Sequence, residues 1–485
     1  MVLPSSFLRA LVSALPPTGI LTDPVDLATY ECDGLTGRRA LPALVCLPET
    51  SDQVQAVVRA CYEHRIPFVA RGAGTGLSGG ALPVEHGIVV SLARMNRILE
   101  VDLDSQRVVV QPGVTNLQVT EAVAGEGFYY APDPSSQQVC TIGGNVAENS
   151  GGAHCLKYGF TANHVTGLAL VLPNGELVRL GGKGCDGAGF DLLGVVVGSE
   201  GTLGIAVEIT LRVLRRPEAV VTLLAAFDST DAAGAAVSGV IASRILPSAM
   251  EIMDRLAIEA AEAAVQAGYP QGAGAILIVE LDGVDVQVEE DLARVEEICR
   301  AEGAFAVRAA LDDEERARIW KGRKAAFAAM GRLSPTYYVQ DGVVPRTKLS
   351  AVLREIARLS DEYGLRVANV FHAGDGNLHP LVLYDGRSQG QAERAKSLAD
   401  AILVACVEAG GSITGEHGVG VDKACSMPLL FDQDDLEAMA RLRRAFDPGE
   451  IANPGKVFPT PRLCGEAPGP YRRHPLEEVG LAERF

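Results

Sequence analysis

The chain has 485 residues, of which 47% are hydrophobic and 21% charged, a balance typical of soluble globular proteins rather than disordered or fibrous ones. This length exceeds what one hydrophobic core usually serves and predicts roughly two to four domains. The formal net charge of -18 excludes the broad basic surfaces that non-specific nucleic-acid binding requires, so we expect no nucleic-acid partner.

The N-terminal segment, MVLPSSFLRALVSALPP, lacks a charged region followed by a long apolar one, which predicts a short amphipathic helix rather than a signal peptide. No apolar run reaches the ~20 residues of a membrane-spanning helix. We therefore expect a cytoplasmic protein with no direct membrane span, whose attachment to the inner membrane, if any, is made through partners.

The ten cysteines are sparse, and no two form a C-x-x-C pair. This pattern predicts reduced thiols of a cytosolic protein, mostly small core residues, and neither an iron–sulfur cluster nor a structural zinc built from cysteine. The cysteines are Cys32, Cys46, Cys61, Cys140, Cys155, Cys185, Cys299, Cys406, Cys425 and Cys464.

A change of sequence character at Pro217 predicts a domain boundary. Before it, glycine-rich loops separate short β-branched runs such as GIVVSL and RVVVQPG. After it, apolar runs such as AVVTLLAAF and AILIVEL alternate with helical stretches rich in Ala, Glu and Arg. The predicted divisions are a helical segment over 1–37, a first domain over 38–217, a second over 218–460 and a surface tail over 461–485.

The stretch RGAGTGLSGG, residues 71–80, follows the expected strand IPFVA and contains the G-x-G-x-x-G spacing of a dinucleotide site. A Rossmann site needs a long helix after the glycines, but Pro83 and Gly87 interrupt the chain and GIVVSL is the next strand. We therefore predict strand–loop–strand. Bare backbone N–H groups, with the hydroxyls of Thr75 and Ser78, would cradle a phosphate. A glycine-rich turn without a ligand is the alternative.

Two more segments of this kind follow, PDPSSQQVCTIGGNVAENSGGAHCLKYG over 132–159 and VVVGSEGTLGIAVEITLRV over 195–213. Three donor-rich segments in one domain indicate a long, polar cofactor contacted along its length. Together they resemble the FAD-binding domain of the vanillyl-alcohol-oxidase/PCMH flavoprotein family. The resemblance implies that the first loop holds the FAD pyrophosphate, the second lines the flavin and the third lies near the adenosine.

The residues implied by this resemblance fall in three groups. The pyrophosphate group is Arg71, Gly72, Ala73, Gly74, Thr75, Gly76, Ser78, Gly79 and Gly80; the flavin group is Pro132, Asp133, Ser136, Gly143, Gly144, Asn145, Asn149 and Gly152; the adenosine group is Glu200, Gly201 and Ile205. Some relatives attach the flavin covalently through a His or Cys. The pyrophosphate loop has neither, so we expect non-covalent FAD, with His154 and Cys155 as the remaining candidates for attachment.

A second constellation lies in FHAGDGNLHP and TGEHGVG. The apolar runs RVANVFH and HPLVLY flank the turn AGDGNL and predict a hairpin that brings His372 and His379 face to face. Two neutral imidazoles and the carboxylate of Glu416 would make a three-ligand metal site with positions open for substrate. Histidines without a metal are the alternative, and a closed structural site would need Asp375 or Asn377 as a fourth ligand.

The motifs VANVFHAGDGNLHP, GEHGVG, QDGVVPRTKL and FDPGEIANPGK resemble those of the FAD-linked D-2-hydroxy-acid dehydrogenases and oxidases, which include glycolate oxidase FAD subunits. The resemblance implies that His372, His379 and Glu416 bind a divalent Zn, Fe or Mn ion. It also implies that His417 takes the substrate's hydroxyl proton while hydride passes from C2 to flavin N5. This division of roles between metal ligands and base is chemically consistent, because a cation lowers the hydroxyl pKa and a neutral His accepts a proton near neutral pH.

The resemblance assigns three further residues. Arg323 would grip the substrate carboxylate, for which a bidentate guanidinium is suited; a solvent-facing helix arginine is the alternative. Asn453 and Lys456, in NPGK, would return to the flavin, with a plain Pro/Gly turn as the alternative.

Two positions bear on the choice of substrate. Leu381 and Val339 stand where 2-hydroxyglutarate enzymes of this family carry polar groups for a second carboxylate. Glycolate or D-lactate is therefore the expected substrate, and D-2-hydroxyglutarate the alternative.

The expected fold class is α+β, with a PCMH-type FAD-binding domain over 38–217. The α+β substrate or cap domain over 218–460 would contain an antiparallel sheet, the metal site and a C-terminal return to the flavin. Electrons would leave through partner subunits carrying FAD and iron–sulfur clusters, because this chain has no cluster motif. Non-redox flavin chemistry, as in alkyl-glycerone-phosphate synthases, and a non-catalytic FAD-binding subunit are rivals that the intact metal motif disfavours.

Overall fold

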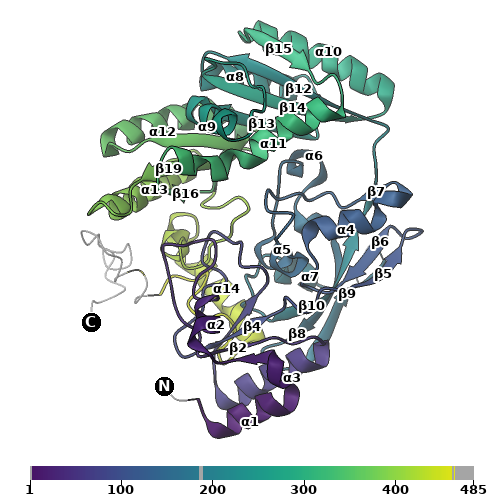
Figure 1. Ribbon diagram of the computed structural model, residues 1–485, viewed down its shortest axis with the longest axis vertical. Helices are drawn as coiled ribbons and strands as arrows, with labels where there is room; N and C mark the ends of the chain where they lie inside the picture. The colour runs from purple at the N-terminus through teal and green to yellow at the C-terminus, as the bar shows by residue number, and fades with distance from the viewer. Residues whose placement is uncertain (1–2, 185–188, 461–463, 465–485) are drawn as a thin grey trace. The chain divides into compact units, whose positions relative to one another are not determined.

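The computed structural model describes residues 3–184, 189–460 and 464 (Figure 1). The chain forms two compact units. The first takes in the chain up to Gly151, then Gly159–Arg216 and the described residues from Glu416 onward; the second takes in Gly152–Tyr158 and Pro217–Gly415. Within the described ranges, no helix combines the length and apolar character needed to cross a lipid bilayer.

The first unit contains a small sheet with the strand order β1-β2-β4-β3, in which β2, β3 and β4 are parallel. Helix α3 connects β2 to β3, and the side chain of Thr50 caps it by accepting the N–H of Gln53. Val54, Val57 and Cys61 recur at helical spacing and are fully buried against the sheet. The bounds are β1 (Ile20–Leu21), β2 (Leu44–Cys46), α3 (Ser51–His64), β3 (Phe68–Arg71) and β4 (Ile88–Ser91), preceded by α1 (Ser5–Ala14) and with α2 (Pro24–Ala28) between β1 and β2.

A five-stranded antiparallel sheet, in the order β5-β6-β10-β8-β9, completes the core of the first unit. Ala169 and Val171 of β8 join the core of the small sheet, whereas Leu168 and Leu170 join a second core with helices α4 and α5. This alternation is the period of two that a strand buried on both faces requires. The bounds are β5 (Ile98–Asp102), β6 (Arg107–Val110), α4 (Asn116–Val123), β7 (Phe128–Tyr129), α5 (Ile142–Glu148), β8 (Val165–Val171), β9 (Leu177–Gly181), α7 (Leu192–Val196), β10 (Ile205–Arg212) and β11 (Leu214–Arg215).

The C-terminal part of the chain returns to the first unit. After η6 (Ala424–Leu429) and α14 (Gln433–Phe446), Ala452 bridges to Phe68 at the edge of the small sheet. The N–H of Asn453 donates to the carbonyl of Phe68 at 2.8 Å. Residues far apart in sequence therefore lie directly beside the start of the glycine loop.

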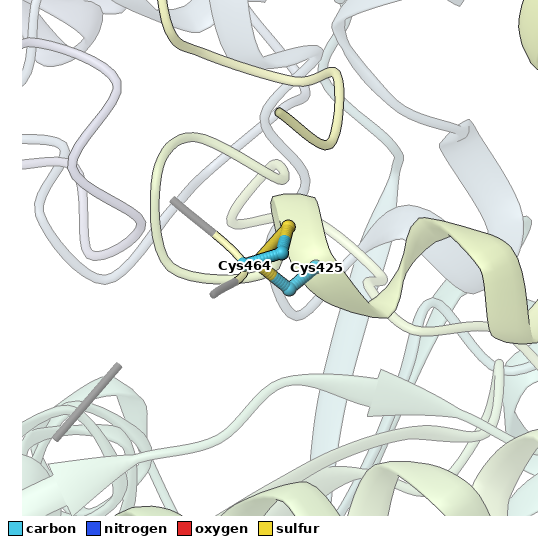
Figure 2. Close-up of a disulfide and its surroundings, with 2 residues drawn as sticks. All are labelled: Cys425 and Cys464. Carbon is cyan, nitrogen blue, oxygen red and sulfur yellow. A yellow bond between two sulfur atoms is a disulfide. The ribbon is translucent and has the colours of Figure 1, made fainter. Parts of the chain in front are cut away.

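The expectation that every cysteine is reduced is wrong for one pair. Cys425 and Cys464 form a disulfide, with their Cα atoms 5.3 Å apart (Figure 2). They are 39 residues apart in sequence, so the pairing depends on the chain returning to η6 and no local spacing predicts it. Cys185 lies outside the described residues. The free thiols are Cys32, Cys46, Cys61, Cys140, Cys155, Cys299 and Cys406, and all but Cys32 are buried, as predicted.

The second unit is built on one antiparallel sheet. Its strand order is β15-β12-β14-β13-β18-β19-β16, and β17 is also paired to β19. This confirms the predicted antiparallel sheet of an α+β domain. The strands are β12 (Ala219–Phe227), β13 (Ala249–Asp254), β14 (Ala275–Gly283), β15 (Ala306–Ala309), β16 (Thr336–Val339), β17 (Gly342–Val343), β18 (Val367–His372) and β19 (Asn377–Tyr384).

Helices cover both faces of this sheet (Figure 1). Leu223, Ala225 and Phe227 of β12 face α8, α10, α12 and α13, whereas Leu224 and Ala226 face α9 and α11. The second of these faces, which we call the α9/α11 face, also contains Glu251, His372 and His379. The helices are α8 (Thr230–Ala242), α9 (Arg255–Val265), α10 (Asp285–Ala301), α11 (Asp313–Ala329), α12 (Leu349–Tyr363) and α13 (Gln391–Glu408), with the short α6 (Cys155–Tyr158) joining this unit from the earlier part of the chain.

Candidate active site

The glycine loop over 71–80 lies between two parallel strands. Strand β3 ends at Arg71, and the next regular element is β4, which begins at Ile88. Gly74 and Gly79 have φ angles of +72° and +80°, which a side chain disfavours. The predicted strand–loop–strand order is thus confirmed, and no helix opens after these glycines as a Rossmann site would require.

The first and second glycine segments lie against each other. A Cβ atom on Gly72 would collide with the hydroxyl of Thr141, which caps α5 by accepting the N–H of Gly144. Asn145 is buried in this helix and accepts a hydrogen bond from Asn116 at 3.1 Å. Asn149 ends the helix in the left-handed conformation and accepts the N–H of Ala162 at 2.8 Å.

The other residues assigned to the flavin group occupy different settings. Pro132, Asp133 and Ser136 lie in the irregular stretch between β7 and α5. Gly143 is pressed against Pro112, since a Cβ there would come within 2.6 Å of the proline Cβ. Gly152 falls in the second unit, with the short helix α6.

The third segment is tied to the first by Asn453. Its amide Nδ2 donates to the carbonyl oxygens of Gly80, at 2.8 Å, and Glu200, at 2.7 Å. Lys456 is almost fully buried and donates from Nζ to the carbonyl of Leu82 at 2.9 Å. Burial lowers the pKa of Lys456 to about 8, although Asp33 and Glu200 act in the opposite direction. Gly201, with a φ of +71°, and the buried Ile205 continue this segment into β10.

Glu416 and His417 begin the part of the chain that returns to the first unit. The residues immediately after them are held by Glu200, whose carboxylate accepts the N–H groups of Val419 at 2.6 Å and Gly420 at 2.7 Å. No local sequence pattern predicts this link, because more than two hundred residues separate its partners.

The predicted histidine hairpin is present in the second unit. Strands β18 and β19 pair so that Val370 is opposite His379 and His372 is opposite Asn377. Since residues two apart on a strand share a face, both imidazoles project from the α9/α11 face. Their ring centroids are 5.1 Å apart and the rings are perpendicular.

Glu251 is a site residue that sequence reasoning missed. It lies on β13 directly opposite His372, is fully buried, and accepts a hydrogen bond from Nδ1 of His372 at 2.7 Å. With Nδ1 of a neutral imidazole donating, the lone pair lies on Nε2. An acid in the middle of the apolar strand AMEIMD was the signal that could have indicated it, because an unpaired buried charge is costly.

Arg323 reaches the same carboxylate from helix α11. Its Nε and Nη2 lie 2.7 and 2.6 Å from Oε2 of Glu251, and only 2% of the residue is exposed. The alternative interpretation of a solvent-facing helix arginine is therefore wrong. Glu251 thus joins an arginine and a histidine in one buried network on the α9/α11 face.

Asp341 is a second buried acid beside the histidine pair. Its Oδ1 lies 3.8 Å from Nδ1 of His379, and its Oδ2 accepts from the hydroxyl of Thr414 at 2.6 Å and the N–H of Gly415 at 2.8 Å. Gly415 is the residue before Glu416, so the chain leading to the predicted third ligand is fixed to the second unit next to His379. Two imidazoles with flanking carboxylates suit a divalent transition metal.

The comparison with known proteins agrees with this architecture. An FAD binding domain model matches residues 42–181, and the model of the FAD linked oxidases, C-terminal domain, matches residues 216–457. The chain is 49% identical to the glycolate oxidase subunit GlcD of Escherichia coli K12, over 99% of this chain and 96% of that protein. The chain belongs to the FAD-linked oxidases, and it is an FAD-dependent oxidoreductase.

Other relatives and solved structures extend the comparison. The chain is 41% identical to GlcD of Bacillus subtilis, over 88% of this chain and 92% of that protein. It is 36% identical to a D-lactate dehydrogenase of Archaeoglobus fulgidus, over 87% and 92%. The structure of p-cresol methylhydroxylase superposes with a TM-score of 0.79 over 94% of this chain and 97% of that chain, at 18% identity. The predicted PCMH-type fold is confirmed.

Proposed function

We propose that the protein oxidises a small D-2-hydroxy acid, glycolate or D-lactate, to the corresponding 2-oxo acid. The observation that carries this proposal is the buried network of Glu251, His372 and Arg323, with His379 beside it, on one face of the second unit. Relatives similar over nearly the whole chain are named glycolate oxidase subunits and D-lactate dehydrogenases.

His372, His379 and Glu416 are the proposed ligands of a divalent Zn, Fe or Mn ion. When bound, the cation supplies positive charge at the substrate's hydroxyl oxygen, and non-covalent FAD accepts the hydride from C2. Glu251 orients the ring of His372 so that Nε2 faces outward from the carboxylate. Asp341 holds the peptide of Gly415 and thereby limits the positions open to Glu416.

His417 is the proposed general base. Its Nε2 lies 3.9 Å from Oε1 of Glu416, so a group that binds at Glu416 is within reach of this imidazole. A neutral imidazole accepts the hydroxyl proton at a pH near 7. Removal of that proton makes C2 a better hydride donor. A cation held by the ligands would lower the pKa of the same hydroxyl, so both act on one proton.

Arg323 is proposed to bind the substrate carboxylate. Glu251 engages Nε and Nη2 of the guanidinium, which fixes its plane for a second, planar partner. Val339 and Leu381 are paired across β16 and β19 and offer only apolar groups. A dicarboxylic substrate would therefore leave its second carboxylate without a charged partner at these positions, which favours a short monocarboxylate.

FAD is proposed to lie along the three glycine segments of the first unit, with its pyrophosphate at Arg71–Gly80. Support comes from the contacts between the segments: Thr141 of the second lies close to Gly72 of the first, and Asn453 donates to carbonyls of the first and the third. Three short loops fixed to one another can present many backbone donors to one extended ligand.

The electron acceptor is proposed to be a partner subunit with FAD and iron–sulfur cofactors, at the cytoplasmic face of the inner membrane. The relative from Escherichia coli is named as a subunit of glycolate oxidase, which implies a multisubunit assembly for that protein. Co-purification of this chain with such a partner, and loss of steady-state turnover when the partner is removed, tests this part of the proposal.

An anaerobic absorbance titration tests the reaction itself. Purified protein with FAD and metal is mixed with glycolate, D-lactate, L-lactate or D-2-hydroxyglutarate. We expect glycolate or D-lactate to bleach the flavin band near pH 7, with L-lactate and D-2-hydroxyglutarate at least about tenfold slower. If no hydroxy acid bleaches the flavin, the dehydrogenase assignment is lost. Faster bleaching by D-2-hydroxyglutarate would overturn the choice of a small substrate.

A further inference from the structure

Glu200 makes an unusual pair of contacts for a residue in a cofactor-binding loop. It is 5% exposed, and its two carboxylate oxygens accept one backbone N–H each, from Val419 at 2.6 Å and from Gly420 at 2.7 Å. The contact with Asn453 uses the main-chain carbonyl of Glu200 instead. The carboxylate is therefore engaged with the segment that directly follows His417.

This segment, residues 418–420, is packed tightly against other parts of the first unit. Gly418 has a φ of +79°, and a Cβ atom there would collide with Glu148 and come within 2.9 Å of Oε1 of Glu200. A Cβ on Gly420, whose φ is +53°, would collide with the carbonyl of Ser78. Both glycines allow the backbone to approach close enough for the carboxylate of Glu200 to bind it.

Glu148 is a second buried carboxyl close to Glu200. Burial raises the pKa of Glu148 well above its ordinary value, and the nearby Glu200 raises it further. Burial also raises the pKa of Glu200, but the N–H groups of Val419 and Gly420 and the charges of Lys423 and Lys456 oppose this. The N–H groups bound to Glu200 favour its charged form, and a charged acceptor strengthens these two hydrogen bonds.

We propose that Glu200 is a positioning residue for the reaction, which fixes the backbone after His417 so that its imidazole stays in place for proton transfer. This inference rests on the proposed role of His417 as the base. It differs from the adenosine contact that sequence resemblance implies, because the side chain of Glu200 acts through the protein backbone. A displacement of about 1 Å in a reacting group can cost on the order of 100-fold in rate.

The test compares Glu200→Gln with Glu208→Gln in the FAD- and metal-loaded protein. An amide at position 200 would turn an NH2 group toward a backbone donor and lose one bond. Glu208 lies on the following strand β10 and pairs with Arg179 at the surface, so its amide variant is the matched control. We expect E200Q to retain FAD and bleach about 10- to 100-fold more slowly at saturating substrate, with KM changed less than about threefold. E208Q should match the unaltered protein.

A double-mutant cycle with His417→Ala separates this role from a general loss of structure. If Glu200 acts through His417, E200Q adds little to the loss already caused by H417A. Losses that multiply, or an E200Q protein that bleaches at the normal rate, overturn the proposal. A normal rate in H417A would instead refute His417 as the base, so the two failures are distinguishable.

Glu200→Asp covers the case in which E200Q purifies without FAD. The shorter carboxylate keeps the charge but reaches only one of the two N–H groups, so we expect FAD to stay bound and bleaching to slow by about 3- to 10-fold. If E200D bleaches at the normal rate while E200Q loses FAD, Glu200 serves cofactor binding and the positioning role is refuted.

Discussion

Glu251 and Glu200 are buried carboxylates in different units, and they use their charge in different ways. Glu251 binds the side chains of His372 and Arg323, whereas Glu200 binds the backbone of Val419 and Gly420. The first arrangement orients side chains that we propose to meet the metal and the substrate. The second sets where a segment of chain lies. One buried carboxylate thus holds side chains in place, and the other holds a stretch of backbone.

His417→Ala tests whether the base belongs to the backbone-held segment of the first unit. Removing a general base typically costs 10²–10⁴-fold, so we expect flavin bleaching to slow by about that factor while the protein stays yellow. The measurement is stopped-flow absorbance under anaerobic conditions. His86→Ala removes an exposed histidine of the same unit and should have no effect. Rapid bleaching by H417A would assign the base to another residue.

Glu251→Gln tests the side-chain network of the second unit. The amide keeps the size of the side chain but loses the charge that His372 and Arg323 share. We expect metal affinity to fall about 10- to 100-fold, as for other residues that orient metal-binding histidines. Metal titration followed by elemental analysis measures it.

Glu259→Gln, on the exposed side of helix α9, is the control for Glu251→Gln. If E251Q binds metal as the unaltered protein does, the network around Glu251 serves stability alone. In that case the contrast between Glu251 and Glu200 disappears.

The sequence predicts the two units' local features far better than the links within them. Strand–turn–strand patterning is enough to bring His372 and His379 together, because a short turn fixes the register of a hairpin. Glu251 reaches His372 only through the pairing of β13 with β18, strands more than a hundred residues apart. No local pattern encodes such a pairing, and the same reason hid the contact of Glu200 with Val419.

Composition was a poor guide to the cysteines for the same reason. The disulfide between Cys425 and Cys464 depends on the course of the chain after α14, which carries no cysteine spacing motif. Arg323 is the opposite case. Its helix is rich in charge, and only the packing of α11 against the sheet buries Arg323 while Arg316 stays half-buried and Arg318 exposed.

Lys456 also binds backbone in the first unit, and its lowered pKa makes the stability of the folded protein depend on pH. Its pKa is lowered from 10.5 to about 8 in the folded protein. Between these values the unfolded chain binds more protons, so stability rises with pH by up to about 1.4 kcal/mol per unit, about 3 kcal/mol in all. Denaturant unfolding at pH 8 and pH 10 measures this, and Lys456→Met should remove the rise. Lys348→Met, at an exposed position, should keep it; an equal rise in both variants would contradict the assignment.

Cys464→Ser is expected to have the smallest effect. It tests how much the disulfide with Cys425 stabilises the C-terminal part of the chain that returns to the first unit. The disulfide closes a loop of 39 residues, for which loop entropy gives about 2–4 kcal/mol. We expect the lower figure, because Asn453 and Lys456 already bind the same segment to the glycine loops. Flavin bleaching should keep its normal rate, since the bond lies beyond these contacts. In the unaltered protein, thiol titration after denaturation should find two more thiols with a reductant than without one. A stability loss well above 4 kcal/mol would mean that the disulfide, and not these backbone contacts, holds the returning chain in place.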